Sequence, residues 1–259
     1  EVEVLPAGYR SRIRGLQNHG QAVTEGKAGE RLAINLADLK TEDLARGMVV
    51  VRPDTFPVTE SVLVEFQYLP YNRKPLKAVV HGQFHVLAAK VNARMELLGE
   101  EKLLPGGKAA AVVATARPIA VAAGDPFVIR GYGIFTTIGG GRVLHPMLSG
   151  EKDFFLSGEA LRVLAGKDLK AKIDLYIKGQ DAKGVSRTEL SGIFNEIGVQ
   201  IDKCIGDLKK DRVLYEDEGG RLYHRDLVLA LRREIVTILA SYHQRNDLRL
   251  GMGREELFQ

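Results

Sequence analysis

Three consecutive glycines followed by an arginine, Gly139, Gly140, Gly141 and Arg142, have the composition of a phosphate-binding loop. Glycine lets a backbone amide approach a phosphate closely, and a guanidinium adds charge. A P-loop, however, has a lysine and then a serine or threonine after its last glycine, whereas Arg142 is followed by Val143. A dinucleotide-binding loop begins a helix, and this segment lies between strand-like runs. It is therefore expected either to lie along a nucleic-acid backbone or to allow close packing of strands, and both interpretations stay open.

Histidine and cysteine give no recognisable metal or catalytic site. His81 and His85 are four residues apart, a spacing that brings two histidines together on a helix. They lie in strand-like sequence, where a rise of about 3.3 Å per residue separates them by roughly 13 Å, too far to share one ion. Cys204 is expected to be a small hydrophobic residue of a helix. Serine, histidine and aspartate sets are recognised by geometry rather than by spacing, so we predict no catalytic residue and no metal site.

Basic residues form two runs in the first half of the chain. The arginines of RSRIRGL (residues 10–16) are expected on one face of a strand. In YNRKPLK (residues 71–77), Arg73, Lys74 and Lys77 surround a proline turn from which side chains can reach a phosphate backbone. For both runs, an ordinary solvated surface is the alternative.

The distribution of charge places the basic surplus in the first part of the chain. The net charge of the 259 residues is +4. Residues 1–150 carry 18 Lys and Arg against 14 Asp and Glu, whereas residues 151–259 carry 19 of each. A polyanionic partner is therefore expected to bind the first part.

Composition favours a globular protein of two or more domains in the cytoplasm. The sequence is 45% hydrophobic and 27% charged, without an apolar run long enough to cross a membrane. Its one cysteine cannot form an internal disulfide and is typical of a reducing compartment. We see no secretory leader, and the chain opens on Glu1 in a strand-like pattern, so it is expected to begin within a longer protein.

Short strand-like runs separated by Gly, Pro and Asn continue to about residue 146. Strands without intervening helices are typical of antiparallel barrels or sandwiches. RPDTFPV is interpreted as a linker, which places a domain boundary near residue 54. The expected strands are residues 2–5, 10–17, 31–36, 48–52, 62–68, 77–81, 85–91, 109–121, 127–132 and 134–144.

The hydrophobic period then becomes helical and predicts a winged-helix domain. A helix over about residues 157–178 precedes a second helix, which Ser186 and Glu189 open as a capping box and Gly198 ends. A third helix, IDKCIGDLKKD (201–211), precedes a hairpin whose turn contains Gly219 and Gly220. The inward faces are expected to be Leu190, Ile193, Phe194 and Ile197 on the second helix, and Ile201, Ile205 and Leu208 on the third.

A long helix capped by Asp226 is expected next, with the tail HQRNDLRLGMGREELFQ opening another winged helix. Its apolar stripe is Leu227, Leu231, Ile235, Ile238 and Tyr242. The predicted domains are the C-terminal part of one β-barrel (1–53), a second β-barrel (54–146), a winged helix (147–227) and the start of another (228–259).

A winged helix also allows a DNA-binding function. In the helix that would enter the groove, however, Asp202, Asp207 and Asp211 offset the lysines at 203, 209 and 210. Carboxylates are unfavourable beside phosphates. A winged-helix DNA-binding regulator with a β-rich effector domain stays as the alternative function.

Four segments of the chain resemble the bacterial selenocysteine-specific elongation factor family, SelB. The family shows "AGxRxAxNLAG", "PLKHGxRVHLHLGTAEVLARV", "GDRFVLRSYSPxxTIGGGxVLDP" and "YHxxNPLxxGMxxEEL". The corresponding segments are GYRSRIRGLQNHGQAVTEGKAGERLAINLADLKTEDLARGMVV, RKPLKAVVHGQFHVLAAKV, GDPFVIRGYGIFTTIGGGRVLHP and SYHQRNDLRLGMGREEL. Phe84, Val86 and Leu250 depart from the family pattern without altering the resemblance.

The resemblance implies a translation factor that carries selenocysteinyl-tRNA to a ribosome stalled at UGA. In the family a first domain is a GTPase that uses GTP and magnesium, two β-barrels follow, and the last winged helices bind an mRNA hairpin. This sequence lacks the GTPase motifs and the last winged helices, so it is expected to be a middle fragment without activity by itself.

The resemblance also assigns candidate site residues. Arg31, in AGER, falls on the arginine proposed to contact the selenocysteinyl group; a selenol ionises readily, and a guanidinium favours the anion. The ordinary alternative is an arginine on a sheet surface that pairs with Glu30 or another acidic residue. The segment from Ile129 to Arg142 resembles the strand that contacts tRNA. The tRNA-backbone candidates are Arg73, Lys74, Lys77, His81, Arg130, Gly139, Gly140, Gly141 and Arg142.

Overall fold

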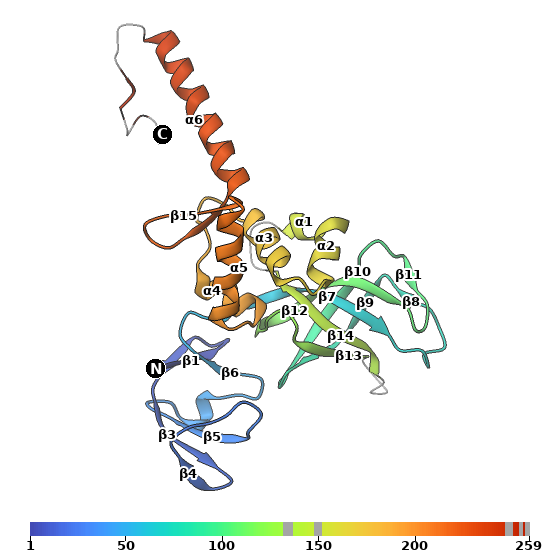
Figure 1. The fold of residues 1–259 in the computed structure, drawn as a ribbon. Helices are drawn as coiled ribbons and strands as arrows, with labels where there is room; N and C mark the ends of the chain where they lie inside the picture. Colours follow the sequence, from blue (N-terminus) through green and yellow to red (C-terminus); the bar gives the residue numbers. More distant parts are fainter. Residues whose placement is uncertain (132–136, 148–151, 247–250, 254–255, 257–259) are drawn as a thin grey trace. The chain divides into compact units, whose positions relative to one another are not determined.

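The structure is a computed structural model of the chain, and it describes residues 1–131, 137–147, 152–246, 251–253 and 256. These residues form two compact units (Figure 1). The first unit comprises Glu1–Lys167 together with Thr188–Gly198, and the second comprises Asp168–Arg187 together with Val199–Gln259. Strands come first in the chain and most helices after them, which confirms the predicted mixed fold class.

Residues 1–51 form two antiparallel three-stranded sheets, ordered β2-β1-β6 and β4-β3-β5. The strand predicted over residues 10–17 is in fact two strands, because strand geometry is interrupted at Arg12, which belongs to neither. The common face predicted for the arginines is therefore wrong: Arg10 and Arg14 lie on different strands and pair with Asp54 and Asp38. The elements are β1 Val2–Leu5, β2 Tyr9–Ser11, β3 Ile13–Asn18, β4 Gln21–Val23, β5 Leu32–Leu36, a 3-10 helix Thr41–Asp43 and β6 Val49–Val51.

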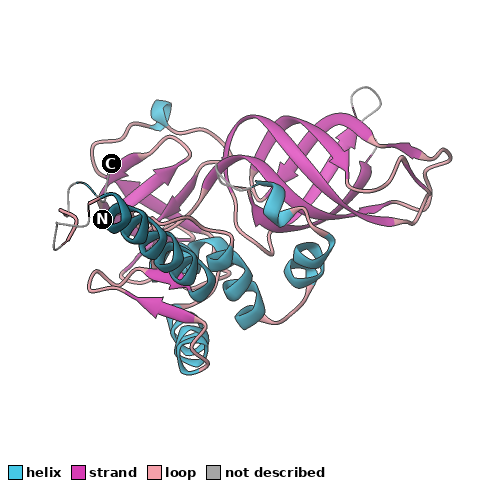
Figure 2. Ribbon diagram, turned by 90° about the horizontal axis from the view of Figure 1, so that it is seen from above, coloured by secondary structure: helices cyan, strands magenta, loops and turns pink. Residues whose placement is uncertain are grey.

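Six antiparallel strands close into a barrel in the order β10-β12-β7-β14-β13-β9 (Figures 1 and 2). Side chains alternate between the core and the outside, as pleated strands require: Val91, Ala93 and Met95 are buried, and the residues between them are exposed. The two-residue strands β8 and β11 pair with each other at one end of the barrel (Figure 1). The strands are β7 Val58–Tyr68, β8 Leu76–Lys77, β9 Val79–Val86, β10 Ala89–Leu97, β11 Lys102–Leu103, β12 Lys108–Ala120, β13 Pro126–Gly131 and β14 Thr137–Pro146.

The structure corrects the strand boundaries on either side of Gly82. Strands were predicted over residues 77–81 and 85–91, but β9 continues through Gly82, and the turn comes at Leu87, which has a φ of 50°. A Cβ at Gly82 would lie 2.5 Å from the carbonyl oxygen of Arg130. This glycine therefore allows β13 to approach β9. Of the strand predicted over 134–144, residues 134–136 lie outside the described residues.

The last barrel strand, β14, carries a buried histidine. The ring of His145 stacks on that of Phe155, in the short helix α1 (Lys152–Phe155), with 4.5 Å between the ring centroids. Burial lowers the pKa of His145 to about 3, so the imidazole is neutral and belongs to the core.

The helix predicted over residues 157–178 is two helices, α2 (Gly158–Ala165) and α3 (Leu169–Lys178). Gly166 follows α2 directly, and the carboxylate of Asp168 accepts a hydrogen bond from the Ala171 amide at 3.2 Å. This contact caps α3 and starts a new helix where the apolar period alone suggested continuity.

The next two helices are α4 (Arg187–Phe194) and α5 (Gly198–Lys210). α4 begins directly after the predicted cap position at residue 186. Ile197 is 65% exposed, so its predicted place on the buried face of α4 is wrong. The helix ends before it, because Asn195 adopts a positive φ of 53°, and Gly198 begins α5 instead of ending α4. The residues that α4 does bury as predicted are Leu190, Ile193 and Phe194.

A hairpin and a long helix complete the described chain. The strands β15 (Leu214–Glu216) and β16 (Leu222–His224) form the predicted wing, and Val185 pairs with Leu222 as an additional bridge. The order of α3, α4, α5 and wing is that of a winged helix.

The long helix is α6 (Arg225–Arg245), and its cap differs from the prediction. His224 precedes the helix, and its Nδ1 accepts a hydrogen bond from the Asp226 amide at 3.1 Å, so Asp226 lies in the first turn. No described residue of α6 is buried. Of its predicted apolar stripe, Leu231, Ile235 and Ile238 are solvent-exposed, and Leu227 and Tyr242 are half-buried.

Candidate nucleic-acid interface

The outer surface of β9, β10 and β13 carries basic side chains. On β9, His81 and His85 alternate with core residues and point outward. Antiparallel pairing places Arg94 opposite His81, and Lys90 opposite His85. Arg130 of β13 lies on the other side of β9. We call these five residues the basic face; Lys90 and Arg94 join it because of strand register, which sequence reasoning had not used.

Acidic residues hardly offset the basic face. Glu96 is the single acidic residue of β9, β10 and β13, and its carboxylate pairs with Arg94 at 2.8 Å. Both side chains are about half-exposed, so the pair is screened by water and contributes little to stability. The surface thus keeps a surplus of positive charge, which suits a polyanion.

The pKa of His85 is affected by the cations that surround its imidazole. Burial lowers its pKa, and the charges of Arg130, Lys90 and Arg46 lower it further. The imidazole is therefore neutral at pH 7, and the positive charge of this part of the basic face comes from lysine and arginine.

The loop between β7 and β8 holds the second predicted group of cations, Arg73, Lys74 and Lys77, all of them exposed. The Tyr68 hydroxyl donates a hydrogen bond to the carbonyl of Lys74 at 2.8 Å. The side-chain amide of Asn72 donates to the carbonyl of Ile138 on β14 at 3.0 Å. These contacts fix the loop backbone, so its basic side chains extend from a defined position.

The three glycines lie in β14 between β7 and β13, and each has a partner on both neighbouring strands. A Cβ at Gly141 would overlap the carbonyl oxygen of Glu65, and one at Gly140 would lie 2.5 Å from that of Phe127. Gly139 likewise faces the backbone of β7. The glycines therefore allow close strand packing, one of the two predicted roles. Contact of this segment with tRNA stays a prediction, and its residues 132–136 lie outside the described residues.

Arg142 is engaged within the first unit. Its Nε donates to the carboxylate of Glu65 at 3.2 Å, and a terminal nitrogen donates to the carbonyl of Ala165 at 2.8 Å. The guanidinium thus links β14 to β7 and to the end of α2. These bonds argue against the predicted contact of Arg142 with a tRNA backbone.

Arg31 lies at a hollow of about 330 Å³ beside β3 and β5. Its ordinary alternative, a pair with Glu30, is absent from the described contacts, where the Glu30 carboxylate accepts from the Lys27 amide at 2.9 Å. The hollow brings polar groups to Arg31 that the sequence had not indicated, because the turn at His19 and Gly20 folds back toward it. The lining residues are Gln17, His19, Gly20, Arg31, Leu32 and Ala33.

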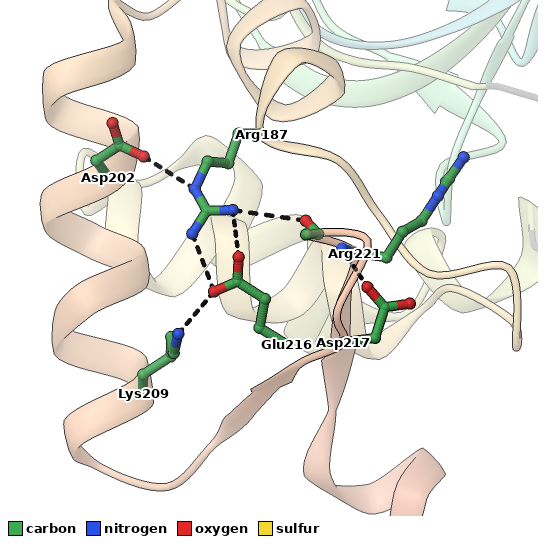
Figure 3. Close-up of polar contacts among 7 residues, drawn as sticks. Arg187, Asp202, Lys209, Glu216, Asp217 and Arg221 are labelled. Atoms are coloured by element: carbon green, nitrogen blue, oxygen red, sulfur yellow. Dashed lines mark hydrogen bonds and ion pairs between the residues drawn. The ribbon is translucent and has the colours of Figure 1, made fainter.

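In the winged helix, by contrast, Arg187 and Lys209 are paired with carboxylates of the same unit (Figure 3). Arg187 donates to both carboxylate oxygens of Glu216, at 2.6 and 3.0 Å, and to Asp202 at 3.1 Å. Lys209 of α5 also reaches Glu216, at 2.6 Å. Hydrogen bonds from Arg187 and Lys209 lower the pKa of Glu216 to about 2. Two lysines of the helix that would read DNA, Lys209 and Lys210, are thus paired with carboxylates of their own domain, which gives the DNA-binding alternative no support.

The described residues show neither a cluster of metal ligands nor a membrane-spanning helix. No group of three or more His, Cys, Asp or Glu in that part of the chain could hold a metal ion. None of its helices is long and apolar enough to cross a membrane.

A closed antiparallel barrel with a basic outer face, followed by a winged helix, defines a class: translation-factor-type β-barrels joined to winged-helix domains. Comparison with known proteins narrows the class to a family. Residues 61–149 match the β-barrel domain of the selenocysteine-specific elongation factor, and residues 236–259 match the winged helix of elongation factor SelB. The chain is therefore similar to selenocysteine-specific elongation factors over its barrel and over its last residues.

Relatives match along nearly the whole chain. The selenocysteine-specific elongation factor of Desulfomicrobium baculatum is 29% identical over 259 residues, which cover 99% of this chain and 41% of that protein. The factor of Haemophilus influenzae is 24% identical, covering 98% and 40%. The crystal structure of a bacterial selenocysteine-specific elongation factor, EF-Sec, shares the fold with a TM-score of 0.71 at 20% identity, covering 99% and 39%. The chain thus spans about 40% of the length of its curated relatives.

Proposed function

We propose that this chain is the RNA-binding and connecting part of a selenocysteine-specific elongation factor. In this proposal the β-barrel binds selenocysteinyl-tRNA, and the winged helix connects the barrel to further domains that bind an mRNA hairpin at the ribosome. GTP and magnesium would bind a GTPase domain whose motifs this sequence does not contain. The site of action would be the cytoplasm. Similarity to the factor of Desulfomicrobium baculatum supports the proposal over 99% of the chain, and the barrel-domain match supports it over residues 61–149.

The observation that carries the RNA-binding role is the basic face. Lys90 and Arg94 of β10 are exposed on the same surface as the half-buried Arg130 of β13, and the single acidic residue of these strands, Glu96, is paired with Arg94. Phosphate contacts of this kind position an RNA helix without reading its sequence. The barrel would therefore supply affinity for the tRNA backbone, and selection of the aminoacyl group would take place elsewhere.

Selection would take place at the hollow beside Arg31. The guanidinium would favour an ionised selenol over the neutral hydroxyl of a seryl group, because only the selenol is an anion near neutral pH. His19 and Gln17 line the same hollow and can orient that group by hydrogen bonding. In a full-length factor, Arg31→Ala is expected to reduce the preference for selenocysteinyl- over seryl-tRNA. An unchanged preference would remove Arg31 from the pocket.

Direct binding of the 259-residue chain tests the proposal. Fluorescence anisotropy with labelled tRNA is expected to show weak binding that falls steeply with salt concentration. A duplex DNA of equal charge is the control, and the chain is expected to show no preference for any DNA sequence. Tight, sequence-specific DNA binding would contradict the proposal and restore the regulator alternative.

A further inference from the structure

Within the first unit, the turn before β6 packs directly on the start of β10. Gly47 of this turn has a φ of 100°, a conformation that favours glycine. A Cβ at Gly47 would lie 2.7 Å from the Cα of Ala89. Carbon atoms pack at about 3.5–4.0 Å, so no side chain fits there. Gly47 is therefore required both by the conformation of the turn and by its contact with the barrel.

A bulge in β12 adds a second contact at the same place. The pairing of β12 with β7 shifts register between Ala114 and Ile119, and Arg117 lies in the shifted stretch. A terminal nitrogen of Arg117 donates to the carbonyl of Lys90 at 3.0 Å. The bulge thus holds the backbone of β10 at the residue that follows Ala89.

We call the contact among Gly47, Ala89 and Arg117 the seam. The three residues line one hollow of only about 50 Å³, so little free space separates the turn from the barrel. On the barrel side, the seam is next to Lys90 of the basic face. The seam therefore adjoins one of the two candidate sites of the first unit.

Hydrogen bonds connect the other side of the seam to the hollow beside Arg31. β5 begins directly after Arg31, and Ala37 follows its last residue. The amide of Ala37 donates to the carbonyl of Arg12 at 2.8 Å, and its carbonyl accepts from the Ser11 hydroxyl. Ser11 ends β2, which pairs with β1, and β1 pairs with β6. Hydrogen bonds thus link β5 to β6, which begins two residues after Gly47.

We infer that Gly47 is a positioning residue: the seam holds the hollow beside Arg31 at a fixed place relative to the basic face, so that one aminoacyl-tRNA reaches both. Two contacts on a rigid frame bind one ligand more tightly than the same contacts on a flexible frame, because binding at the first raises the effective concentration at the second. The inference rests on the proposed function for the groups that bind at the two places, but not for the rigidity of the seam.

Gly47→Ala in the full-length factor tests the inference, with Gly99→Ala as the matched control. Gly99 also has a positive φ, 74°, but no atom lies within 4 Å of its added Cβ. The control therefore carries the backbone strain without the clash. Gly47→Ala is expected to bind selenocysteinyl-tRNA about 10-fold more weakly than wild type. Its affinity for deacylated tRNA and its salt slope are expected to stay at the wild-type values, because no charge of the basic face changes.

Gly99→Ala is expected to bind both tRNAs like wild type. If Gly47→Ala weakens both tRNAs equally, the residue serves only the fold, and the inference is overturned. An unchanged preference for selenocysteinyl-tRNA in Gly47→Ala overturns it as well.

Arg117→Gln loosens the seam from the barrel side without backbone strain, and it keeps the test decisive if Gly47→Ala does not fold. Its loss of one positive charge affects both tRNAs alike, so the readout is the ratio of the two affinities. That ratio is expected to fall about 3-fold, because one exposed hydrogen bond is lost. A wild-type ratio would mean that Arg117 does not hold the seam, contrary to the inference.

Spin labels measure the seam without RNA. Gln21→Cys and Ala114→Cys place labels on exposed positions of β4 and β12, in a Cys204→Ser background that removes the native thiol. Electron–electron resonance is expected to give one narrow distance distribution for the chain and for Gly99→Ala, and a broader one for Gly47→Ala.

The two readouts separate the seam from the proposed function. If Gly47→Ala broadens the distance distribution but wild type binds selenocysteinyl- and deacylated tRNA equally, the proposed function fails and the seam stands as a rigid joint. If wild type prefers selenocysteinyl-tRNA and Gly47→Ala keeps both that preference and a narrow distribution, the inference fails and the proposed function stands.

Discussion

The interactions that stabilise the barrel differ from those that stabilise the winged helix. The two regions also differ in whether their basic side chains are paired with carboxylates. In the barrel, strands approach so closely that Gly139, Gly140 and Gly141 leave no room for a side chain, while Lys77 and Lys90 have no partner among the described ion pairs. In the winged helix, Arg187 of α4 and Lys209 and Lys210 of α5 are paired with carboxylates of their own unit. A basic residue therefore indicates a binding surface only where the fold does not already use its charge.

The largest expected effect is on barrel packing. Gly141→Ala would drive a Cβ into the Glu65 carbonyl, and the free energy of unfolding should fall by about 2–4 kcal/mol. Gly206→Ala is the matched control, since no atom lies within 4 Å of its added Cβ and alanine favours the interior of α5; it should stabilise by about 0.5–1 kcal/mol. Chemical denaturation measures both. Equal effects would show that close packing does not hold the barrel.

The second effect tests the ion pairs of the winged helix. Glu216→Gln would leave Arg187 and Lys209 without their shared carboxylate, whose side chain is only 19% exposed. The lowered pKa of Glu216 corresponds to a stabilisation of at most about 3 kcal/mol. Because Arg187 and Lys209 are about 40% exposed, water screens the pairs, and the free energy of unfolding is expected to fall by about 1–2 kcal/mol. Glu218→Gln, at the exposed wing tip, should change the unfolding free energy by less than about 0.5 kcal/mol. A loss as large for Glu218→Gln would mean that wing charge in general, and not this network, stabilises the domain.

The same carboxylate predicts a dependence on pH. Its pKa is about 2 in the folded state against an ordinary value of 4.5, so its contribution is complete above about pH 4.5 and is lost as the pH falls toward 2. The difference in unfolding free energy between wild type and Glu216→Gln should therefore shrink over that interval. A difference that stays constant between pH 5 and pH 3 would contradict the assignment.

The smallest effect on stability is expected at the basic face. Lys90→Gln should leave the free energy of unfolding within about 0.5 kcal/mol of wild type, because Lys90 is exposed and has no described ion pair. Its affinity for tRNA should nevertheless fall a few-fold, with a salt slope shallower by roughly one. A loss of stability without a loss of tRNA affinity would mean that Lys90 stabilises the fold, as the paired cations of the winged helix do, and does not bind RNA.

The sequence alone predicts those parts of the fold that depend on local pattern. Alternation along strands such as β12 and the helical stripe of Leu190, Ile193 and Phe194 appear in the structure, because period and burial are local consequences of pleat and helix geometry. Helix ends were less predictable. Gly198 is typical of a stop, yet Asn195 ends α4, and His224 replaces Asp226 as a cap.

The candidate sites depend on register, which a single sequence does not contain. Nothing in the spacing of His85 and Arg130 indicates that they share the basic face, since 44 residues of chain separate them. Arg142 could likewise be predicted as exposed and basic, but not as bound to Glu65 and to the end of α2. Arg31, by contrast, was found through family resemblance, and the structure adds the hollow around it.

The salt dependence of tRNA binding by two charge-matched variants tests the central distinction most directly. Arg73→Gln/Lys90→Gln removes two unpaired cations from the barrel, and Lys209→Gln/Lys210→Gln removes two paired cations from α5. The barrel variant is expected to have a slope of log K against log salt that is shallower by about 2, and the α5 variant is expected to keep the wild-type slope. A wild-type slope for the barrel variant, together with a shallower slope for the α5 variant, would contradict the assignment of RNA binding to the barrel.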